Sequence, residues 1–95
     1  MKGITFEWDA KKASLNKNKH GISFDEAKTV FFDEQAKVIH DPEHSDDEDR
    51  FVILGLSASM KVLVVCHCYR EKDSVIRIIS ARKATRHESK QYRGK

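Results

Sequence analysis

The sequence lacks long hydrophobic runs. The longest unbroken one among its 95 residues is the segment VLVVC at 62–66, whereas a membrane-spanning helix needs about 20 apolar residues. The N-terminus has neither the hydrophobic core of a signal peptide nor the Arg- and Ser-rich character of a transit peptide. We therefore expect a cytoplasmic protein with no membrane role.

Cysteine, proline and glycine are also scarce. The two cysteines, Cys66 and Cys68, would share one face of a strand, and this spacing suits a disulfide poorly. One proline and four glycines mark no linker, and we find no internal repeat or low-complexity tract. A chain of this length with 39% hydrophobic residues can bury one small core. Residues 1–95 are therefore predicted to be a single domain.

Charge is abundant and unevenly distributed. The formal net charge is only +3, but residues 82–95 hold six Lys or Arg against one acid, and residues 41–50 hold six acids against Arg50 alone. Clustered cations beside His67, His87, Tyr69 and Tyr92 suit a phosphodiester backbone and its bases. Nucleic acid, in particular RNA, is the ligand class that this pattern favours.

The N-terminal half is predicted to contain one strand and two helices. Residues 4–8 alternate as in a strand that buries Phe6 and Trp8, and Asp9 can cap a helix that ends at Gly21. Ser23 and Glu26 have the spacing of a capping box for a second helix. The apolar stripe of that helix comprises Phe24, Ala27, Val30 and Phe31.

The C-terminal half is predicted to contain four strands and a last helix. The strands span 36–40, 51–56, 62–69 and 75–81. Their short connections favour antiparallel pairing, and Thr85 with Glu88 forms a capping box for the last helix. The order β-α-α-β-β-β-β-α predicts an α+β domain, with helices mainly on one face of a four-stranded, mostly antiparallel sheet. The other face would be free for a ligand or partner.

Several separated motifs resemble one known family. These are FEWD at 6–9, KHGISFDEA at 19–27, DPEHSDDEDRF at 41–51 and RIISARKATRHE at 77–88. In order and spacing they resemble BrnT, a type II toxin of RelE-like fold. The resemblance covers nearly the whole chain.

The resemblance implies a function and a set of partners. It implies a ribonuclease that arrests growth by cleaving RNA and is held inactive by BrnA, a ribbon-helix-helix antitoxin. The expected complex is a heterotetramer of two toxins and two antitoxins that represses its own operon. Operator DNA would be contacted only through the antitoxin.

Metal-independent RNA cleavage needs a base for the 2′-hydroxyl proton and cations for the charge on the phosphorane. By alternation His67 shares a face with Tyr69, and we take it as the candidate base on the open face. The alternative is a half-buried strand histidine. Arg77 interrupts an apolar strand and is a candidate phosphate ligand. Its structural alternative is an ion pair with Glu71 or Glu7.

The remaining site candidates lie near the C-terminus. Arg82 and Lys83 leave their strand on opposite faces, and the family resemblance favours Arg82 as catalytic. Tyr92 is a candidate to stack on a base or donate a proton, or else a packing anchor. The predicted RNA-binding residues are Lys83, Arg86, Lys90 and Arg93, of which the last three form one ridge of the helix. A solvated helix face is the alternative for that ridge.

No metal or other cofactor is expected. His40 and His44 flank an acidic segment, but Pro42 argues against a helix that would bring both histidines to one ion, and a solvated loop is favoured. Alternation also separates His67 from the two thiols beside it. A non-catalytic nucleic-acid-binding module and an antitoxin-binding scaffold remain alternatives. His67 and Arg77 within strands favour chemistry over both.

Overall fold

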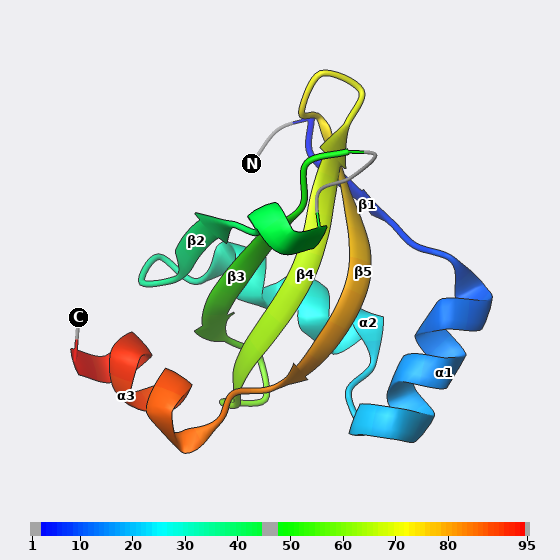
Figure 1. The fold of residues 1–95 in the computed structure, drawn as a ribbon. Helices are drawn as coiled ribbons and strands as arrows, with labels where there is room; N and C mark the ends of the chain where they lie inside the picture. Colours follow the sequence, from blue (N-terminus) through cyan, green and yellow to red (C-terminus); the bar gives the residue numbers. More distant parts are fainter. Residues whose placement is uncertain (1–2, 45–47, 95) are drawn as a thin grey trace.

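The computed structural model describes residues 3–44 and 48–94, which form a twisted sheet flanked by helices (Figure 1). The strands are β1 (Thr5–Glu7), β2 (Lys37–His40), β3 (Phe51–Leu56), β4 (Val62–Arg70) and β5 (Val75–Lys83). The helices are α1 (Ala10–His20), α2 (Phe24–Ala27) and α3 (Arg86–Gly94), with 3-10 segments η1 (Lys28–Phe32) and η2 (Pro42–His44).

The sheet of the described residues has five strands, in the order β1-β5-β4-β3-β2. Strands β2 to β5 pair antiparallel, as the short connections predicted. The prediction that the sheet has four strands was wrong. The predicted N-terminal strand, β1, joins the sheet as a fifth strand and pairs parallel to β5, with Thr5 opposite Val75. The alternation of residues 4–8 predicts a strand there, but its partner lies far along the chain.

The first helix begins and ends where the sequence predicts. Asp9 caps α1, since its Oδ1 accepts hydrogen bonds from the backbone N–H groups of Lys11 at 2.8 Å and Lys12 at 3.2 Å. At the other end Gly21 adopts φ 75°, which favours glycine, and its N–H donates to the Lys17 carbonyl. These local signals fix where the chain turns back toward the sheet.

The second helix is shorter than its apolar stripe suggests. Ser23 Oγ accepts from Glu26 N at 3.0 Å, but the Glu26 carboxylate accepts from the Ser57 hydroxyl at 2.7 Å instead of closing the capping box. After Ala27 the chain continues as η1, where the Thr29 hydroxyl donates to the Glu26 carbonyl at 2.6 Å. Such a side-chain bond competes with the α-helical pattern.

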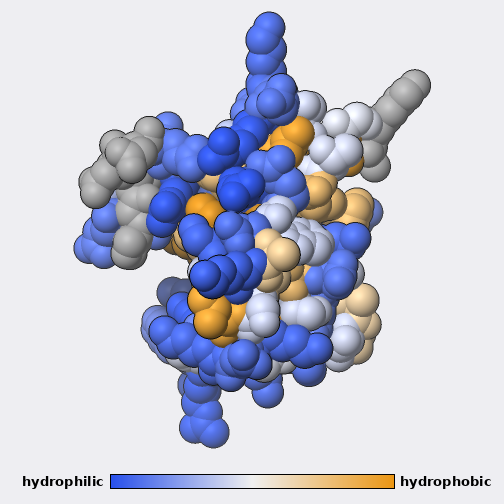
Figure 2. Space-filling model, turned by 90° about the vertical axis from the view of Figure 1, so that its right-hand side faces the viewer, coloured by the Kyte–Doolittle hydropathy of each residue, from blue (hydrophilic) through white to orange (hydrophobic). Residues whose placement is uncertain are grey.

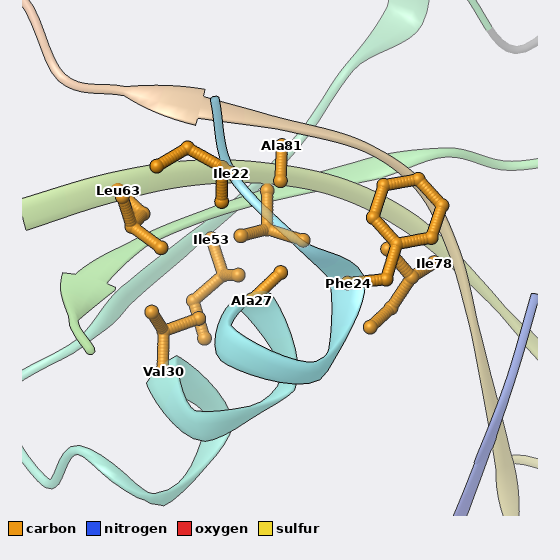
Figure 3. Close-up of a cluster of buried hydrophobic side chains, with 9 residues drawn as sticks. Ile22, Phe24, Ala27, Val30, Ile53, Leu63, Ile78 and Ala81 are labelled. Carbon is orange, nitrogen blue, oxygen red and sulfur yellow. The ribbon is translucent and has the colours of Figure 1, made fainter. Parts of the chain in front are cut away.

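The core lies between these helices and one face of the sheet (Figure 3). Side chains from α2 and η1 point toward those of β3, β4 and β5. The Trp8 ring packs edge-on against Phe24 at 5.8 Å, as its predicted core position requires. The nine buried residues of this cluster are Ile22, Phe24, Ala27, Val30, Ile53, Leu63, Val65, Ile78 and Ala81.

Asn16 ties α1 to the sheet. Its amide nitrogen donates to the carbonyls of Ala81 at 2.9 Å and Ile22 at 3.0 Å, and its Oδ1 accepts from Ala81 N at 3.1 Å. The side chain thereby satisfies the backbone of β5 beyond the last residue that β1 pairs. The backbone next to Arg82 is held by these bonds.

The outer surface of α1 is polar. Asn16 is its buried residue, whereas Leu15 is 60% exposed. Figure 2, which views the molecule from the side of α1 and β1, shows hydrophobic residues only as separate patches among hydrophilic ones. This side of the molecule offers no continuous apolar surface.

Candidate active face

The sheet has one covered face and one open face. Ile53, Val65 and Ala81 are paired neighbours in β3, β4 and β5, and they belong to the core under α2 and η1. Because side chains alternate along a strand, the neighbouring pairs point to the other side. We call that side the open face. In Figure 1 it faces the viewer, with α2 behind the sheet.

Side chains on the open face form rows across the strands. The first row, nearest α3, contains Lys37, Leu54, Val64 and Arg82. The second row contains Ile39, Val52, Cys66 and Ser80. The third row includes Cys68, Arg77 and Glu7.

Two adjoining hollows occupy the first two rows. Val52 and Val64 line both, one hollow lying against Glu88 and Gln91 of α3 and the other extending to Arg82. The floor is aliphatic, and Cys66 lies in it with its pKa raised by burial. An apolar floor with a charged rim can hold a polar chain whose charges reach the rim.

Arg82 is the best-oriented cation of this surface. Its guanidinium donates to both oxygens of Glu88, at 2.8 and 3.0 Å, while its side chain remains 41% exposed. Glu88 also completes the predicted capping box, since it accepts from Thr85 N and its own N–H donates to the Thr85 hydroxyl. The hydrogen bond from Arg82 lowers the pKa of Glu88 to about 2. The helix start thus orients the arginine.

Arg77 adopts its structural alternative. Its guanidinium donates to Glu7 at 2.9 Å, and Glu7 also lies 3.7 Å from Arg70, which pairs with Glu48 at 3.1 Å. The Arg77 side chain is 31% exposed. The predicted partner Glu7 is therefore confirmed, and a phosphate would have to share Arg77 with that carboxylate.

His67 lies on the covered face, so its predicted position on the open face was wrong. The residue is 0% exposed and stacks edge-on against Phe31 at 4.8 Å. Its ring nitrogens lie 3.2 Å from the Val65 carbonyl and 3.2 Å from the Tyr69 hydroxyl, and burial lowers its pKa. The alternation that grouped His67 with Tyr69 is correct, but η1 covers the face they share. The ring therefore has no exposed surface, and contact with RNA would require η1 to move away.

Tyr92 anchors α3. Its hydroxyl donates to Asp33 Oδ2 at 2.6 Å, the same oxygen that accepts from Leu56 N at 2.8 Å. The hydrogen bond to Asp33 raises the pKa of Tyr92. This geometry is that of the packing anchor weighed as the alternative, and proton donation to a substrate would require Tyr92 to leave Asp33.

The other C-terminal cations are exposed. Lys83 lies in the register position opposite Leu63, on the face opposite to that of Arg82, as predicted. Arg86, Lys90 and Arg93 all lie on α3, which has no buried residue. Lys37 Nζ from β2 donates to the Gln91 carbonyl at 2.6 Å. The helix therefore carries its charge toward solvent while polar contacts hold it to the sheet.

The family comparison identifies the family of this chain. The model of the ribonuclease toxin BrnT of type II toxin-antitoxin systems matches residues 8–88. The chain belongs to this family. The crystal structure of the ribonuclease toxin BrnT from Brucella abortus shares the fold, with a TM-score of 0.66 and 22% identity over 87% of this chain and 99% of that one. No curated protein sequence matches the chain.

In this BrnT-family chain two of the separate motifs, at 41–51 and 77–88, meet on the open face. The 77–88 motif supplies Arg82 and the 41–51 motif supplies Asp41 and Arg50, and all three line the same hollow. Sequence reasoning assigned no site role to Asp41. The signal that could have found it is the strand register, because Asp41 directly follows β2 and Arg50 directly precedes β3, whose ends pair His40 with Phe51.

Metal-ligand groups and membrane-spanning helices can be assessed for residues 3–44 and 48–94. Within them no three His, Cys, Asp or Glu side chains gather as metal ligands. The predicted acidic loop forms η2 at 42–44, and its residues 45–47 lie outside the described residues. No helix in the described part of the chain is long and apolar enough to cross a membrane.

Proposed function

We propose that this BrnT-family toxin is a metal-independent endoribonuclease whose RNA substrate lies across the open face of the sheet. The observation that carries the proposal is Arg82, which is partly exposed at a hollow and oriented by two hydrogen bonds to Glu88. Preoriented cations stabilise charge that develops in a transition state without reorganising at the moment of reaction. In this scheme Arg82 faces the phosphorane.

The roles of the other cations follow from their positions. Arg77 in the third row would bind a second phosphate of the same strand, in competition with Glu7. The exposed cations of α3 and Lys83 would neutralise flanking phosphates, independently of sequence. The partners of Tyr92 favour a supporting role, in which it keeps α3 and thereby Glu88 in place.

The antitoxin belongs to the same proposal. Type II toxin-antitoxin families pair a toxin with an antitoxin, and we propose a BrnA-like ribbon-helix-helix protein in a complex of two toxins and two antitoxins. That complex would repress its own operon through antitoxin contacts to operator DNA. Co-expression with a BrnA-like ribbon-helix-helix protein, followed by light scattering of the purified complex, tests the stoichiometry.

The decisive test is RNA cleavage by purified, antitoxin-free protein in the presence of EDTA, on free and on ribosome-bound transcripts. We expect wild type to cleave, and Arg82→Ala to lose at least 100-fold in rate, because one charge-stabilising donor is worth about that much. Lys19→Gln is the matched control, because this exposed cation lies on α1. Binding of RNA without cleavage in either form would instead support a nucleic-acid-binding module.

A further inference from the structure

The third row of the open face extends past the ends of β2 and β3. The β2–β3 register runs from Lys37 opposite Leu54 to His40 opposite Phe51, and one more hydrogen bond follows, from Asp41 N to the Arg50 carbonyl at 2.8 Å. Asp41 and Arg50 are therefore the next opposed pair. Pro42 favours an extended conformation for Asp41 and ends the strand there.

Alternation places both side chains on the open face. Asp41 is two residues from Ile39, and Arg50 is two residues from Val52, both members of the second row. Directly opposed side chains on one face have Cβ atoms about 4.5–5.5 Å apart. Both residues line the hollow that extends to Arg82. A carboxylate and two guanidiniums therefore surround one space.

The charges of Asp41 and Arg50 affect the pKa of Cys66 in the floor of the hollow. Burial raises the pKa of the Cys66 thiol, while the charge of Arg50 lowers it and that of Asp41 raises it. These opposite effects agree with a cation and a carboxylate close to Cys66. The half-buried thiol keeps its proton at neutral pH, so it is no base.

Two other proton-accepting side chains of the described residues are Glu88, beside Arg82, and His67 on β4. Glu88 accepts two hydrogen bonds from Arg82 and one from Thr85 N, and its pKa of about 2 makes it a weak base. His67 lies on the covered face. Among the described side chains that line the hollow beside Arg82, Asp41 is the carboxylate.

We propose that Asp41 is the general base of the ribonuclease reaction and that Arg50, with Arg82, binds the reacting phosphate. This inference rests on the proposed function. The 2′-hydroxyl proton passes to the Asp41 carboxylate as the O2′–P bond forms and the P–O5′ bond breaks. Water protonates the departing 5′-oxygen, and the products are a 2′,3′-cyclic phosphate and a 5′-hydroxyl.

The residue composition of the hollow explains why these roles suit one another. Cleavage needs a base on one side of the phosphate and positive charge around its oxygens. Asp41 and Arg50 lie just beyond the ends of β2 and β3 in the third row, whereas Arg82 lies on β5 in the first row, so the second row separates them. A phosphate above that row would meet a cation from either side.

The experiment compares Asp41→Asn, Asp41→Glu and wild type in single-turnover cleavage of a defined transcript at pH 7. Among the described side chains, the charged or titratable groups that line the two hollows are Lys37, Asp41, Arg50, Cys66, Arg82 and Glu88. Asp41→Asn should be at least 100-fold slower than wild type, because its amide cannot take the 2′-hydroxyl proton. Asp41→Glu keeps a carboxylate and should cleave faster than Asp41→Asn.

Controls separate this inference from the proposed function. Asp49→Asn is the same substitution in the same segment, at an exposed carboxylate that bonds His40, and it should cleave as wild type does. A transcript with 2′-deoxyribose at the cleaved nucleotide should resist cleavage. If wild type cleaves and Asp41→Asn keeps its rate, or Asp41→Glu is no faster than Asp41→Asn, Asp41 is not the base. If wild type cleaves neither free nor ribosome-bound RNA, the proposed function itself fails.

Discussion

At the scale of single residues, the covered and open faces give similar side chains opposite roles. His67 is enclosed by Phe31, Phe51 and Tyr69, and its neutral ring fits because burial penalises the charged form. Arg82 remains partly exposed because Glu88 satisfies only part of its guanidinium. The pH dependence of the free energy of unfolding should reveal this difference at His67 and at Glu88, the partner of Arg82.

Replacing His67 tests its structural role. Its folded-state pKa lies below the ordinary 6.5, so its contribution to stability is complete above about pH 6.5 and is lost as pH falls toward the lowered value. Glutamine can keep both hydrogen bonds without titrating. We expect His67→Gln to cost about 1–2 kcal/mol at pH 7.5 and the difference from wild type to shrink at pH 5.5, measured by urea unfolding.

The same variant should cleave RNA at a rate within a few fold of wild type, per folded molecule. A loss of 100-fold or more with an intact circular dichroism spectrum would restore His67 as the base. An unchanged pH dependence of unfolding would contradict its burial as a neutral ring.

Glu88 titrates at lower pH than His67. Its pKa of about 2 lies below the ordinary 4.5, so the stability it contributes is present above pH 4.5 and is lost as pH falls toward 2. We expect Glu88→Gln to lower the free energy of unfolding by about 1–2 kcal/mol at pH 7, a discounted value because the pair is partly exposed. Thermal unfolding at pH 7 and pH 3 measures this.

The control is Glu34→Gln, at an exposed carboxylate, which should unfold like wild type at both pH values. If Glu88→Gln is as destabilising at pH 3 as at pH 7, the ion pair with Arg82 is not its main contribution.

At the scale of elements, close approach between η1 and β3 determines how the core closes. Gly55 lies where a Cβ atom would be 3.1 Å from Ala36 Cβ and 3.2 Å from Val30 Cβ. Both neighbours pack in or against the core cluster. The glycine is needed here because a side chain would not fit, and not because of its backbone conformation, since its φ is not positive.

Gly55→Ala should therefore destabilise the protein by about 1–3 kcal/mol, as overpacking does in a dense core. Gly94→Ala is the matched control, because a Cβ there meets nothing within 4 Å. Chemical denaturation of both variants makes the comparison. Equal stability of the two would mean that η1 can move away from β3 without cost.

At the scale of the whole molecule, opposed charge poles should control RNA affinity. The cations of α3 are exposed, whereas Arg70 and Arg77 are paired with acids. Screened, solvent-exposed cations bind phosphates with a strong salt dependence, whereas paired arginines contribute less. Long-range attraction should therefore come mainly from the C-terminal helix.

We expect the triple variant R86Q/K90Q/R93Q to bind single-stranded RNA more weakly, with a salt slope of log K reduced by about 2, since each phosphate contact contributes about 0.7. Fluorescence anisotropy between 50 and 300 mM salt measures the slope. K11Q/K12Q/K17Q on α1 is the control and should keep it. Identical slopes for the two triple variants would remove α3 from the RNA-binding surface.

Local sequence signals determined much of this protein. The cap at Asp9, the stop at Gly21 and the box of Thr85 with Glu88 each depend on residues within a few positions, so they could be predicted. The strands β2 to β5 and their antiparallel pairing followed from period two and short connections. The separated motifs identified the family before any geometry was known.

Only the tertiary structure decided which face of the sheet is open. Alternation predicts which residues share a face, but it does not predict which face α2 and η1 will cover. Because they cover the face of His67, that residue is buried, whereas Arg82 on the other face is partly exposed. It also added β1 as a parallel edge strand, placed Glu7 against Arg77 and brought the ends of β2 and β3 to the hollow of Arg82. These outcomes depend on contacts between distant segments, whose energies no local pattern contains.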